Sequence, residues 1–397
     1  MNRKLLVGLL LGVVLVLGFA LVMPTAAQDR WDGADDLPVN PLECPAAEGA
    51  GEASPAEMSM PEYDGGQPTD APDLAGQPIV LVDVPKLVGI GYFAATTLGQ
   101  QQAAEELGNV TVTTDAPTEA NIDDQIAVID NYITQGVNGI LFAANDPVAI
   151  APVLTRALES GIHVVGYDAN SEPAAREWFV NQAEFNGIAK AMIDSMVAEI
   201  GADGSFAIVT STFTTPNQAR WIAEMQAYQG KCYPELTWLE TVEAQEDNVL
   251  SFNQATTLIN KYGPDLDGIF GMTSVATPAA ADAVAQAGLC AVDAVAGAAG
   301  SAEDAVAVVG LATPNAMKPY VTGDFAGCVK SVVLWNPIDL GYAAVYVLRA
   351  VVDGEFAPGD TSVMAGRLGE LQVVNGSEVL LGPPFIYTAE NIDGFDF

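Results

Sequence analysis

From residue 79 onward, short apolar runs rich in Val and Ile alternate with longer stretches whose apolar residues recur at helical spacing. This alternation is typical of βαβ units and predicts parallel sheets covered by helices. Strands are predicted at 87–93, 110–114, 139–143, 163–167, 178–180, 206–210, 237–242, 268–271, 305–311 and 328–334. Helices are predicted at 96–107, 121–135, 147–160, 184–200, 217–229, 248–262, 277–287 and 338–352. About ten βα units exceed one ordinary open sheet, so the predicted fold class is α/β with two doubly wound parallel sheets.

The N-terminus has a different pattern, that of an export signal. Two basic residues precede an apolar run from Leu5 to Met23, and small residues follow it up to Ala27. This order predicts a signal peptide over residues 1–27 that is cleaved after Ala27. The alternative is an uncleaved membrane anchor, because about 19 apolar residues can span a bilayer. No cysteine follows the run directly, so a lipid-anchor motif is not supported.

Residues 28–78 form an acidic segment with eight prolines and twelve acidic residues against one arginine. The segment has almost no periodic apolar pattern, so it buries too little surface to offset the entropy of ordering. It is therefore expected to be a flexible linker. A leader without a role and a tether that holds the domain away from a surface both fit this composition.

The whole chain carries 14 basic and 51 acidic side chains, a formal net charge of −37. Nucleic acid is excluded as a partner because phosphate contacts need clustered Lys and Arg. Anionic membrane surfaces are disfavoured by the same argument of charge sign. Half of the residues are apolar, so a wholly disordered acidic chain is excluded as well.

Four cysteines follow the signal: Cys44, Cys232, Cys290 and Cys328. An exported compartment permits disulfides, and four cysteines allow three pairings. Their spacing does not match a zinc site. Because Cys44 lies in the acidic segment, it is expected to have no partner or only a structural role. A pair among the other three is left open.

Motifs of common catalytic sites are absent from the sequence. Gly89 and Gly91 lack the third glycine and the acidic partner of a dinucleotide fingerprint, and neither a P-loop nor a nucleophile elbow occurs. The single histidine, His163, has no partner at ligand spacing and is expected to be structural. The sequence therefore predicts no catalytic residue, no metal site, no cofactor and no enzymatic activity. A secreted sugar-modifying enzyme is the alternative from another class.

Polar and aromatic side chains gather where the predicted strands end. In open parallel sheets, ligands bind outside the carboxyl ends of the strands. Flat rings cover the apolar face of a sugar, and Asp and Asn bind its hydroxyls, so this mixture favours a polyol. Asp168 and Asn145 could instead be helix caps, and Phe93 and Trp335 could be core residues. The side chains at these ends are Tyr92, Phe93, Asn145, Asp146, Asp168, Asn170, those of 212–218, those of 272–274, Pro314, Asn315, Trp335 and Asn336.

Eight segments carry a resemblance to a known family. They are PKLVGIGYF (85–93), ANDP (144–147), GYD (166–168), NQARW (217–221), ATPN (312–315), LWNPIDLG (334–341), AGRLG (365–369) and ENI (390–392). In this order, they resemble the ribose-type periplasmic sugar-binding proteins that feed ABC importers. Within that group they are most similar to the rhamnose-binding and autoinducer-2-binding receptors. The resemblance covers residues 79–397 and implies a type I periplasmic binding protein fold, with two α/β lobes joined by a three-stranded hinge.

The resemblance also implies roles for individual residues. Lys86 and Asp168 would contact ligand hydroxyls from the first lobe, and Phe93 would stack on the ligand. The second lobe and the crossover would contribute the remaining contacts. The full set of predicted ligand-binding residues is Lys86, Tyr92, Phe93, Asn145, Asp168, Asn217, Gln218, Trp221, Met272, Ser274, Trp335 and Asn336.

Two departures separate this chain from the autoinducer-2 receptors. Those receptors carry Asp-Gln where this chain has Asn217-Gln218, and Pro-Asp-Ala where it has 272–274. The segments 335–341 and 365–369 are closer to the rhamnose branch. The expected ligand is therefore a sugar, rhamnose or a related deoxyhexose or pentose. Autoinducer-2 is the alternative ligand.

The implied lobes are 79–182 plus 337–370 and 183–336 plus 371–397. The expected partners are a small sugar and the membrane permease of an ABC importer, and the chain is expected to be a monomer. It would act in the periplasm or at the outer face of the cytoplasmic membrane. LacI-type repressors share such lobes, but they need an N-terminal helix-turn-helix and a basic surface, which this sequence lacks.

Overall fold

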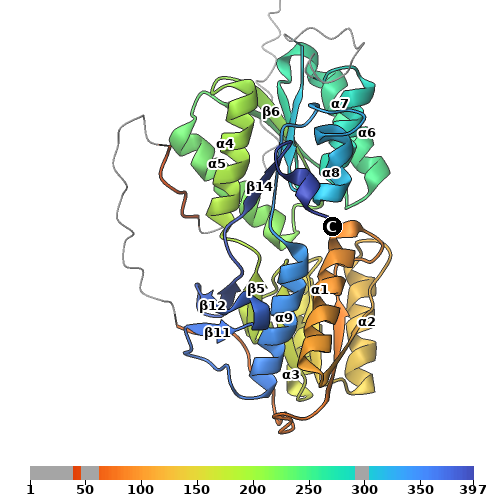
Figure 1. Ribbon diagram of the computed structural model, residues 1–397, viewed down its shortest axis with the longest axis vertical. Coiled ribbons are helices and arrows are strands. Elements are labelled where there is room, and N and C mark those ends of the chain that lie inside the picture. Colours follow the sequence, from red (N-terminus) through yellow and green to blue (C-terminus); the bar gives the residue numbers. More distant parts are fainter. Residues whose placement is uncertain (1–38, 46–61, 291–303) are drawn as a thin grey trace, which may run out of the picture.

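The computed structural model describes residues 39–45, 62–290 and 304–397, so the predicted signal peptide lies outside the described residues. Two α/β lobes lie one above the other along the long axis of the molecule (Figure 1). No helix in the described ranges is long and apolar enough to cross a membrane.

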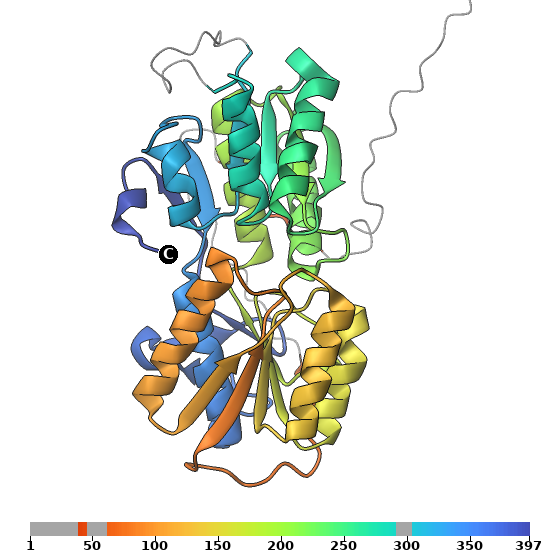
Figure 2. The same ribbon diagram turned by 90° about the vertical axis from the view of Figure 1, so that its right-hand side faces the viewer.

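The first lobe is built on an eight-stranded sheet in the order β11-β12-β13-β5-β4-β3-β1-β2. All neighbours from β13 to β2 pair in parallel, whereas β12 pairs antiparallel with both β11 and β13. Helices α1 and α9 cover one face of the sheet, and α2 and α3 cover the other (Figure 2). The strands are β1 (Ile79–Val84), β2 (Val110–Thr114), β3 (Gly139–Phe142), β4 (His163–Tyr167), β5 (Trp178–Asn181), β11 (Ser362–Met364), β12 (Glu370–Val373) and β13 (Glu378–Leu380). The helices are α1 (Gly91–Leu107), α2 (Ile122–Gln135), α3 (Pro147–Glu159) and α9 (Pro337–Val352).

The second lobe has a parallel sheet in the order β7-β6-β8-β9. A parallel bridge between Leu311 and Val333 connects β9 to an antiparallel pair formed by β10 and β14. Its strands are β6 (Ser205–Thr210), β7 (Thr237–Glu243), β8 (Gly268–Gly271), β9 (Ala307–Gly310), β10 (Ser331–Leu334) and β14 (Phe385–Thr388). Its helices are α4 (Phe185–Ile200), α5 (Pro216–Cys232), α6 (Asn248–Tyr262), α7 (Ala276–Gln286) and α8 (Pro314–Val321). Two doubly wound α/β lobes confirm the predicted fold class.

In the described part of the chain, three passages connect the sheets: 181–185, 334–337 and 380–385. The expected division at residue 370 is wrong, because β12 and β13 belong to the sheet of the first lobe. These strands are only three or four residues long and follow one another without an α-helix between them, and β13 pairs with the distant β5, so no βα rhythm marks them. The chain returns to the second lobe only at β14.

The predicted strand at 87–93 is also wrong. The first strand is Ile79–Val84, residues 87–90 form a loop, and α1 begins at Gly91. Asp83 interrupts the apolar run of β1, so the strand does not stand out in the sequence as a continuous apolar segment. The carboxylate is nevertheless buried inside the lobe, where the Tyr167 and Thr114 hydroxyls donate to it at 2.9 and 3.1 Å.

The described parts of 28–78 do not form a free linker. Residues 62–78 pack on the first lobe, where the Tyr63 ring lies 5.1 Å from that of Trp178 and its hydroxyl donates to the carbonyl of Glu177. Residues 39–45 pack on the second lobe, and Cys44 forms a disulfide with Cys232 of α5. The expectation that Cys44 has no partner is therefore wrong, since tertiary contacts order a segment that its composition leaves undetermined. Cys290 and Cys328 form the second disulfide.

Candidate functional site

A cavity lies between the two lobes and is lined by residues of both. It opens at the carboxyl ends of β1 and β4 in the first lobe and of β6, β7 and β8 in the second. These include the points where each sheet reverses its strand order, the usual ligand position in doubly wound folds. The lining residues are Lys86, Ile90, Tyr92, Phe93, Asp168, Asn217, Gln218, Trp221, Glu246, Met272, Thr273, Ser274, Leu311, Leu334 and Trp335.

Lys86 follows β1 and is held in place through its backbone. The Asn145 side chain donates to the carbonyl of Lys86 at 2.9 Å, and Gln125 donates to the carbonyl of Pro85 at 3.1 Å. Gln125 in turn accepts hydrogen bonds from the backbone and side-chain nitrogens of Asn145. This buried amide pair fixes the loop, so the Lys86 ammonium reaches the cavity although its side chain is only 4% exposed.

Asp168 follows β4 and adopts a left-handed backbone conformation with φ of 59°. L-residues rarely hold this conformation unless their surroundings impose it, and such strain is concentrated at functional sites. Its Oδ1 accepts a hydrogen bond from the Tyr92 hydroxyl at 2.9 Å, and its Oδ2 lies 3.3 Å from the Lys86 ammonium. Oδ2 is buried and receives no hydrogen bond from any described residue, so it is free to accept one from a ligand.

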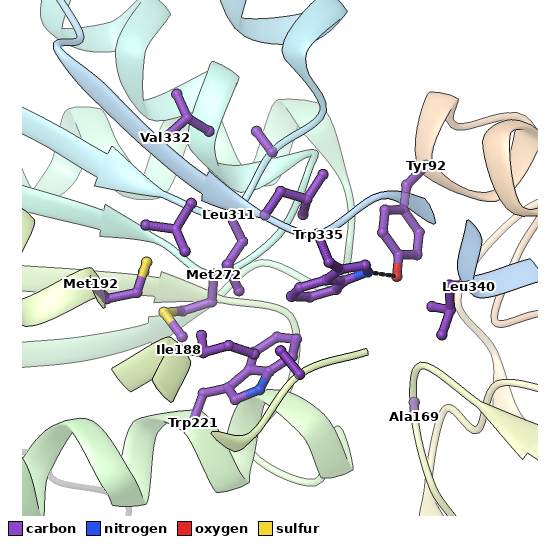
Figure 3. Packing of buried hydrophobic residues seen from close by; sticks show 14 of the residues in the cluster. Tyr92, Ala169, Ile188, Met192, Trp221, Met272, Leu311, Val332, Trp335 and Leu340 are labelled. Carbon is purple, nitrogen blue, oxygen red and sulfur yellow. Dashed lines mark hydrogen bonds between the residues drawn. The ribbon is translucent and has the colours of Figure 1, made fainter. Parts of the chain in front are cut away.

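Tyr92 connects this charged pair to the crossover between the lobes. The Trp335 indole nitrogen donates to the Tyr92 hydroxyl at 2.9 Å, a bond drawn in Figure 3. Burial, followed by the neighbouring Asp168 carboxylate, raises the pKa of Tyr92 well above its ordinary value. The phenol therefore stays protonated and donates to Asp168. The Tyr92 hydroxyl thus accepts one hydrogen bond from Trp335 and donates one to Asp168.

Asn217 and Gln218 begin α5 and face this pair from the other lobe. The Asn217 amide oxygen accepts from Lys86 at 3.3 Å, and its nitrogen donates to Asp168 at 3.3 Å. Gln218 accepts through Oε1 from the Thr210 hydroxyl at 2.6 Å and from the Ser211 backbone at 2.8 Å. These bonds orient the Gln218 amide so that its nitrogen points toward the cavity.

The opposite wall is aromatic and apolar. Trp221 and Trp335 lie with ring centroids 5.6 Å apart, and Met272 and Leu311 pack beside them (Figure 3). The Trp221 indole nitrogen is buried without a hydrogen-bond partner in the described part of the chain. A buried donor left unpaired costs about 1–3 kcal/mol, so a ligand oxygen would stabilise this site.

Ten of the twelve predicted ligand-binding residues line the cavity. The exceptions are Asn145, whose amide holds the loop of Lys86, and Asn336, which caps α9 by accepting from the backbone of Ile338 at 2.9 Å. Strand ends favour caps and ligand contacts alike, so the sequence could not separate them. Of the other strand-end residues, Asn315 donates to Asp396 outside the cavity.

Several lining residues escaped the sequence analysis. Glu246 lies three residues beyond β7, where an extension of the strand-end rule would have found it. Thr273 belongs to the predicted strand end 272–274 but was not among the predicted ligand contacts, while Ile90, Leu311 and Leu334 are apolar and carry no signal of function. The sequence places no carboxylate at ligand spacing from His163, but in the structure its Nδ1 lies 3.0 Å from the Glu177 carboxylate. That pair lies outside the cavity and fits the structural interpretation of His163.

Within the described ranges, no group of three or more His, Cys, Asp and Glu residues is arranged to hold a metal ion. The donor set of the cavity is instead one ammonium, two carboxyls, two amides, hydroxyls and indoles. Such groups bind hydroxyls in pairs of donated and accepted hydrogen bonds.

A family model for the periplasmic binding protein domain matches residues 82–356. The chain belongs to the periplasmic binding protein family. This periplasmic binding protein is similar to a sugar ABC transporter from Actinomyces odontolyticus, with 30% identity, 82% of this chain and 100% of that chain covered, and a TM-score of 0.63. The expected family and the type I fold are therefore confirmed.

Two further structures are informative. An ABC transporter solute-binding protein from Clostridium phytofermentas with bound L-rhamnose has 29% identity and a TM-score of 0.70, with 80% of this chain and 98% of that chain covered. LsrB from Clostridium saccharobutylicum in complex with AI-2 has a TM-score of 0.72 at 22% identity, with 80% and 100% covered, and shows the fold alone. The family consists of solute-binding proteins of ABC importers, which places the periplasmic binding protein outside the cytoplasm.

Proposed function

We propose that the cavity binds a neutral sugar, rhamnose or a related deoxyhexose or pentose, and that the loaded protein delivers it to the permease of an ABC importer. The observation that carries this proposal is the composition of the cavity. Asp168 Oδ2 and Trp221 Nε1, an acceptor and a donor, are both buried, and neither has a hydrogen-bond partner among the residues that the structure describes. A hydroxyl-rich ligand supplies both partners.

The apolar wall favours a sugar with a hydrophobic edge. Phe93, Met272 and Leu311 line the cavity together with the two indoles. The methyl group and ring C–H face of a deoxyhexose would bury against such side chains, at about 25 cal/mol per Å² of apolar area. The L-rhamnose bound by the similar Clostridium phytofermentas protein supports this ligand class.

Titration calorimetry against L-rhamnose, D-fucose, D-arabinose and autoinducer-2 tests the proposal. A neutral sugar should bind most tightly, and an Asp168→Ala variant should bind it at least tenfold more weakly, because a hydrogen bond to a charged group contributes roughly 1.5–3 kcal/mol. Asp130→Ala is the matched control. Asp130 lies on the same lobe, outside the cavity, in an exposed pair with Arg156.

Four outcomes would contradict the proposal. Tightest binding of autoinducer-2 would assign a signal receptor instead of a sugar carrier. Turnover of any compound in the panel would make the protein a sugar-modifying enzyme. No binding by the wild type would reject the ligand class, and unchanged affinity in Asp168→Ala would leave Asp168 with only a structural role.

The remaining expectations belong to the same proposal. We infer export by residues 1–27, lobe closure about the three passages and a monomeric state. Mass analysis of the protein exported from its host distinguishes cleavage after Ala27 from an uncleaved anchor. Light scattering of the purified protein tests the monomer.

A further inference from the structure

Glu246 reaches the cavity through a strained turn. Among the described residues, only Asp70, Asp168, Gln245 and Glu246 combine a side chain with a positive φ, and the last two have φ of 53° and 55°. Two of these four residues are carboxylic acids that line the same cavity from opposite lobes. Such backbone strain persists only where the surroundings impose it, and it is concentrated at functional sites.

The turn is fixed by backbone hydrogen bonds to the end of β6. The amide of Ala244 donates to the carbonyl of Thr210 at 2.8 Å, and that of Gln245 donates to Ser211 at 2.9 Å. Asp247 then caps α6 by accepting from the backbone of Leu250 at 2.7 Å. The position of Glu246 between a fixed turn and a capped helix is therefore set by the fold.

Side-chain contacts with Thr273 and Gln218 orient the Glu246 carboxyl. The Gln218 amide oxygen is already occupied by Thr210 and Ser211, so its nitrogen donates to Glu246 Oε1 at 3.2 Å. A carboxylate accepts about four hydrogen bonds. Ligand hydroxyls can therefore reach Glu246 without displacing Gln218.

The charges of the cavity do not balance. Lys86 is the only cationic side chain among the described lining residues, and it pairs directly with Asp168. Burial raises the pKa of Glu246 most, and the Asp168 carboxylate raises it further. Lys86, Thr273 and Gln218 surround the same carboxyl and lower its pKa. Glu246 has no ion-pair partner of its own within the described ranges, so the cavity holds one carboxyl more than it can neutralise.

We propose that Glu246 is a specificity-determining residue that accepts hydroxyl hydrogen bonds from a neutral sugar and excludes sugars that carry a carboxylate or phosphate. This inference rests on the proposed function. An anionic group would meet Glu246 and Asp168 with only Lys86 to neutralise three charges. Unlike charges are favoured and like charges disfavoured most strongly where water is excluded.

Calorimetry on the full protein with a matched sugar series tests the exclusion. D-fucose, D-galactose and D-galacturonate differ only at carbon six, and L-rhamnose is the second neutral probe. The wild type should bind its tightest neutral sugar at least 100-fold more tightly than D-galacturonate. Glu246→Gln, which keeps the shape of the side chain, should reduce this ratio at least tenfold, and Glu246→Ala should reduce it similarly. Glu235→Gln, an exposed change of the same charge on the same lobe, should leave it unchanged.

A pH series separates recognition from a structural role. Burial raises the pKa of Glu246, so in the wild type the binding of D-galacturonate should strengthen as the pH is lowered and Glu246 takes up a proton. This gain should be absent in Glu246→Gln. An unchanged ratio in both Glu246 variants, or equal wild-type affinity for the acid and the neutral sugar, would overturn the inference while leaving the proposed function intact. If no neutral sugar binds the wild type, the proposed function fails and the inference fails with it.

Discussion

The strand order β2-β1-β3-β4 in the first lobe is repeated as β7-β6-β8-β9 in the second, but the stabilising contacts of the two lobes differ. Arg176, buried in the first lobe, donates to Asn170 at 3.0 Å and to Ser377, which also bonds Asp64. Both described disulfides lie in the second lobe. Both lobes have buried polar contacts, and the described part of the second lobe has covalent bonds in addition.

The lobes also contribute different chemistry to the cavity. The first lobe supplies an ion pair, Lys86 and Asp168, held by buried amides and a phenol. The second lobe supplies neutral amides, an indole and the additional carboxyl of Glu246. A ligand that bridges the lobes would therefore meet fixed charges on one side and mainly neutral donors and acceptors on the other.

The largest expected effect comes from removing a disulfide of the second lobe. Cys44 and Cys232 are 188 residues apart. The chain-entropy model gives a disulfide that closes such a loop a stabilisation of about 5 kcal/mol, which is an upper value for the loss when the bond is removed. The double variant Cys44→Ser and Cys232→Ser should lose several kcal/mol of unfolding free energy. Hydrogen exchange should show faster opening in α4 and α5 than in α1 and α9.

The second disulfide provides the matched control for that experiment. Cys290 and Cys328 close a shorter loop of 38 residues, so their double Ser variant should lose somewhat less, about 4 kcal/mol in the same model. If α1 and α9 lost protection as much as α4 and α5, the two lobes would not be stabilised independently.

The sequence predicted the parts of the fold that depend on local pattern. The bounds of β2, β8 and α6 are those expected, because short apolar runs and periodic helices are flanked by turn or capping residues. The Cys44–Cys232 bond and the pairing of β13 with β5 join residues far apart in sequence, and the short strands β11 to β13 follow one another without the α-helices of a βα pattern. Glu246 was missed because it lies three residues beyond β7, in a turn with two consecutive positive φ angles.

A second effect should distinguish the lobes by pH. Asp83 is the fifth residue of β1, and the fifth residue of the corresponding strand β6 is Val209. Burial raises the pKa of Asp83 to about 7, although hydrogen bonds from Tyr167, Gln100 and Thr114 act in the opposite direction. A pKa raised in the folded state favours folding at low pH, and this contribution is lost as the pH rises from about 4 through 7.

Asp83→Asn should therefore be more stable than the wild type at pH 8, by roughly 3–4 kcal/mol at 1.36 kcal/mol per pKa unit, with little difference from ionisation at pH 4. Urea unfolding at both pH values measures this difference. Val209→Ala in the second lobe serves as the control: its loss should be the same at pH 4 and pH 8. If the difference in unfolding free energy between Asp83→Asn and the wild type were the same at pH 4 and pH 8, the Asp83 carboxyl would not titrate between these two pH values.

The smallest effect concerns Asn217, the side chain that joins the amides of the second lobe to the charges of the first. Its amide accepts from Lys86 and donates to Asp168, both at 3.3 Å, which only a group with both polarities can do. Asn217→Asp removes the donor and places a second carboxylate against Asp168. Sugar affinity at pH 8 should fall about tenfold, equal to about 1.4 kcal/mol.

Asn217→Ala separates the two causes of that loss, because it removes the donor without adding charge. The Asp variant should bind more weakly than the Ala variant at pH 8, because it adds a carboxylate beside Asp168. High salt should narrow the same gap only slightly, since buried charges are weakly screened. If the wild type and Asn217→Asp bound the sugar equally well at pH 8, a carboxylate at position 217 would have no effect on ligand binding. The expected difference in affinity follows from the different chemistry of the two lobes. A carboxylate facing Asp168 needs a cation to neutralise it, and Lys86 is already paired with Asp168.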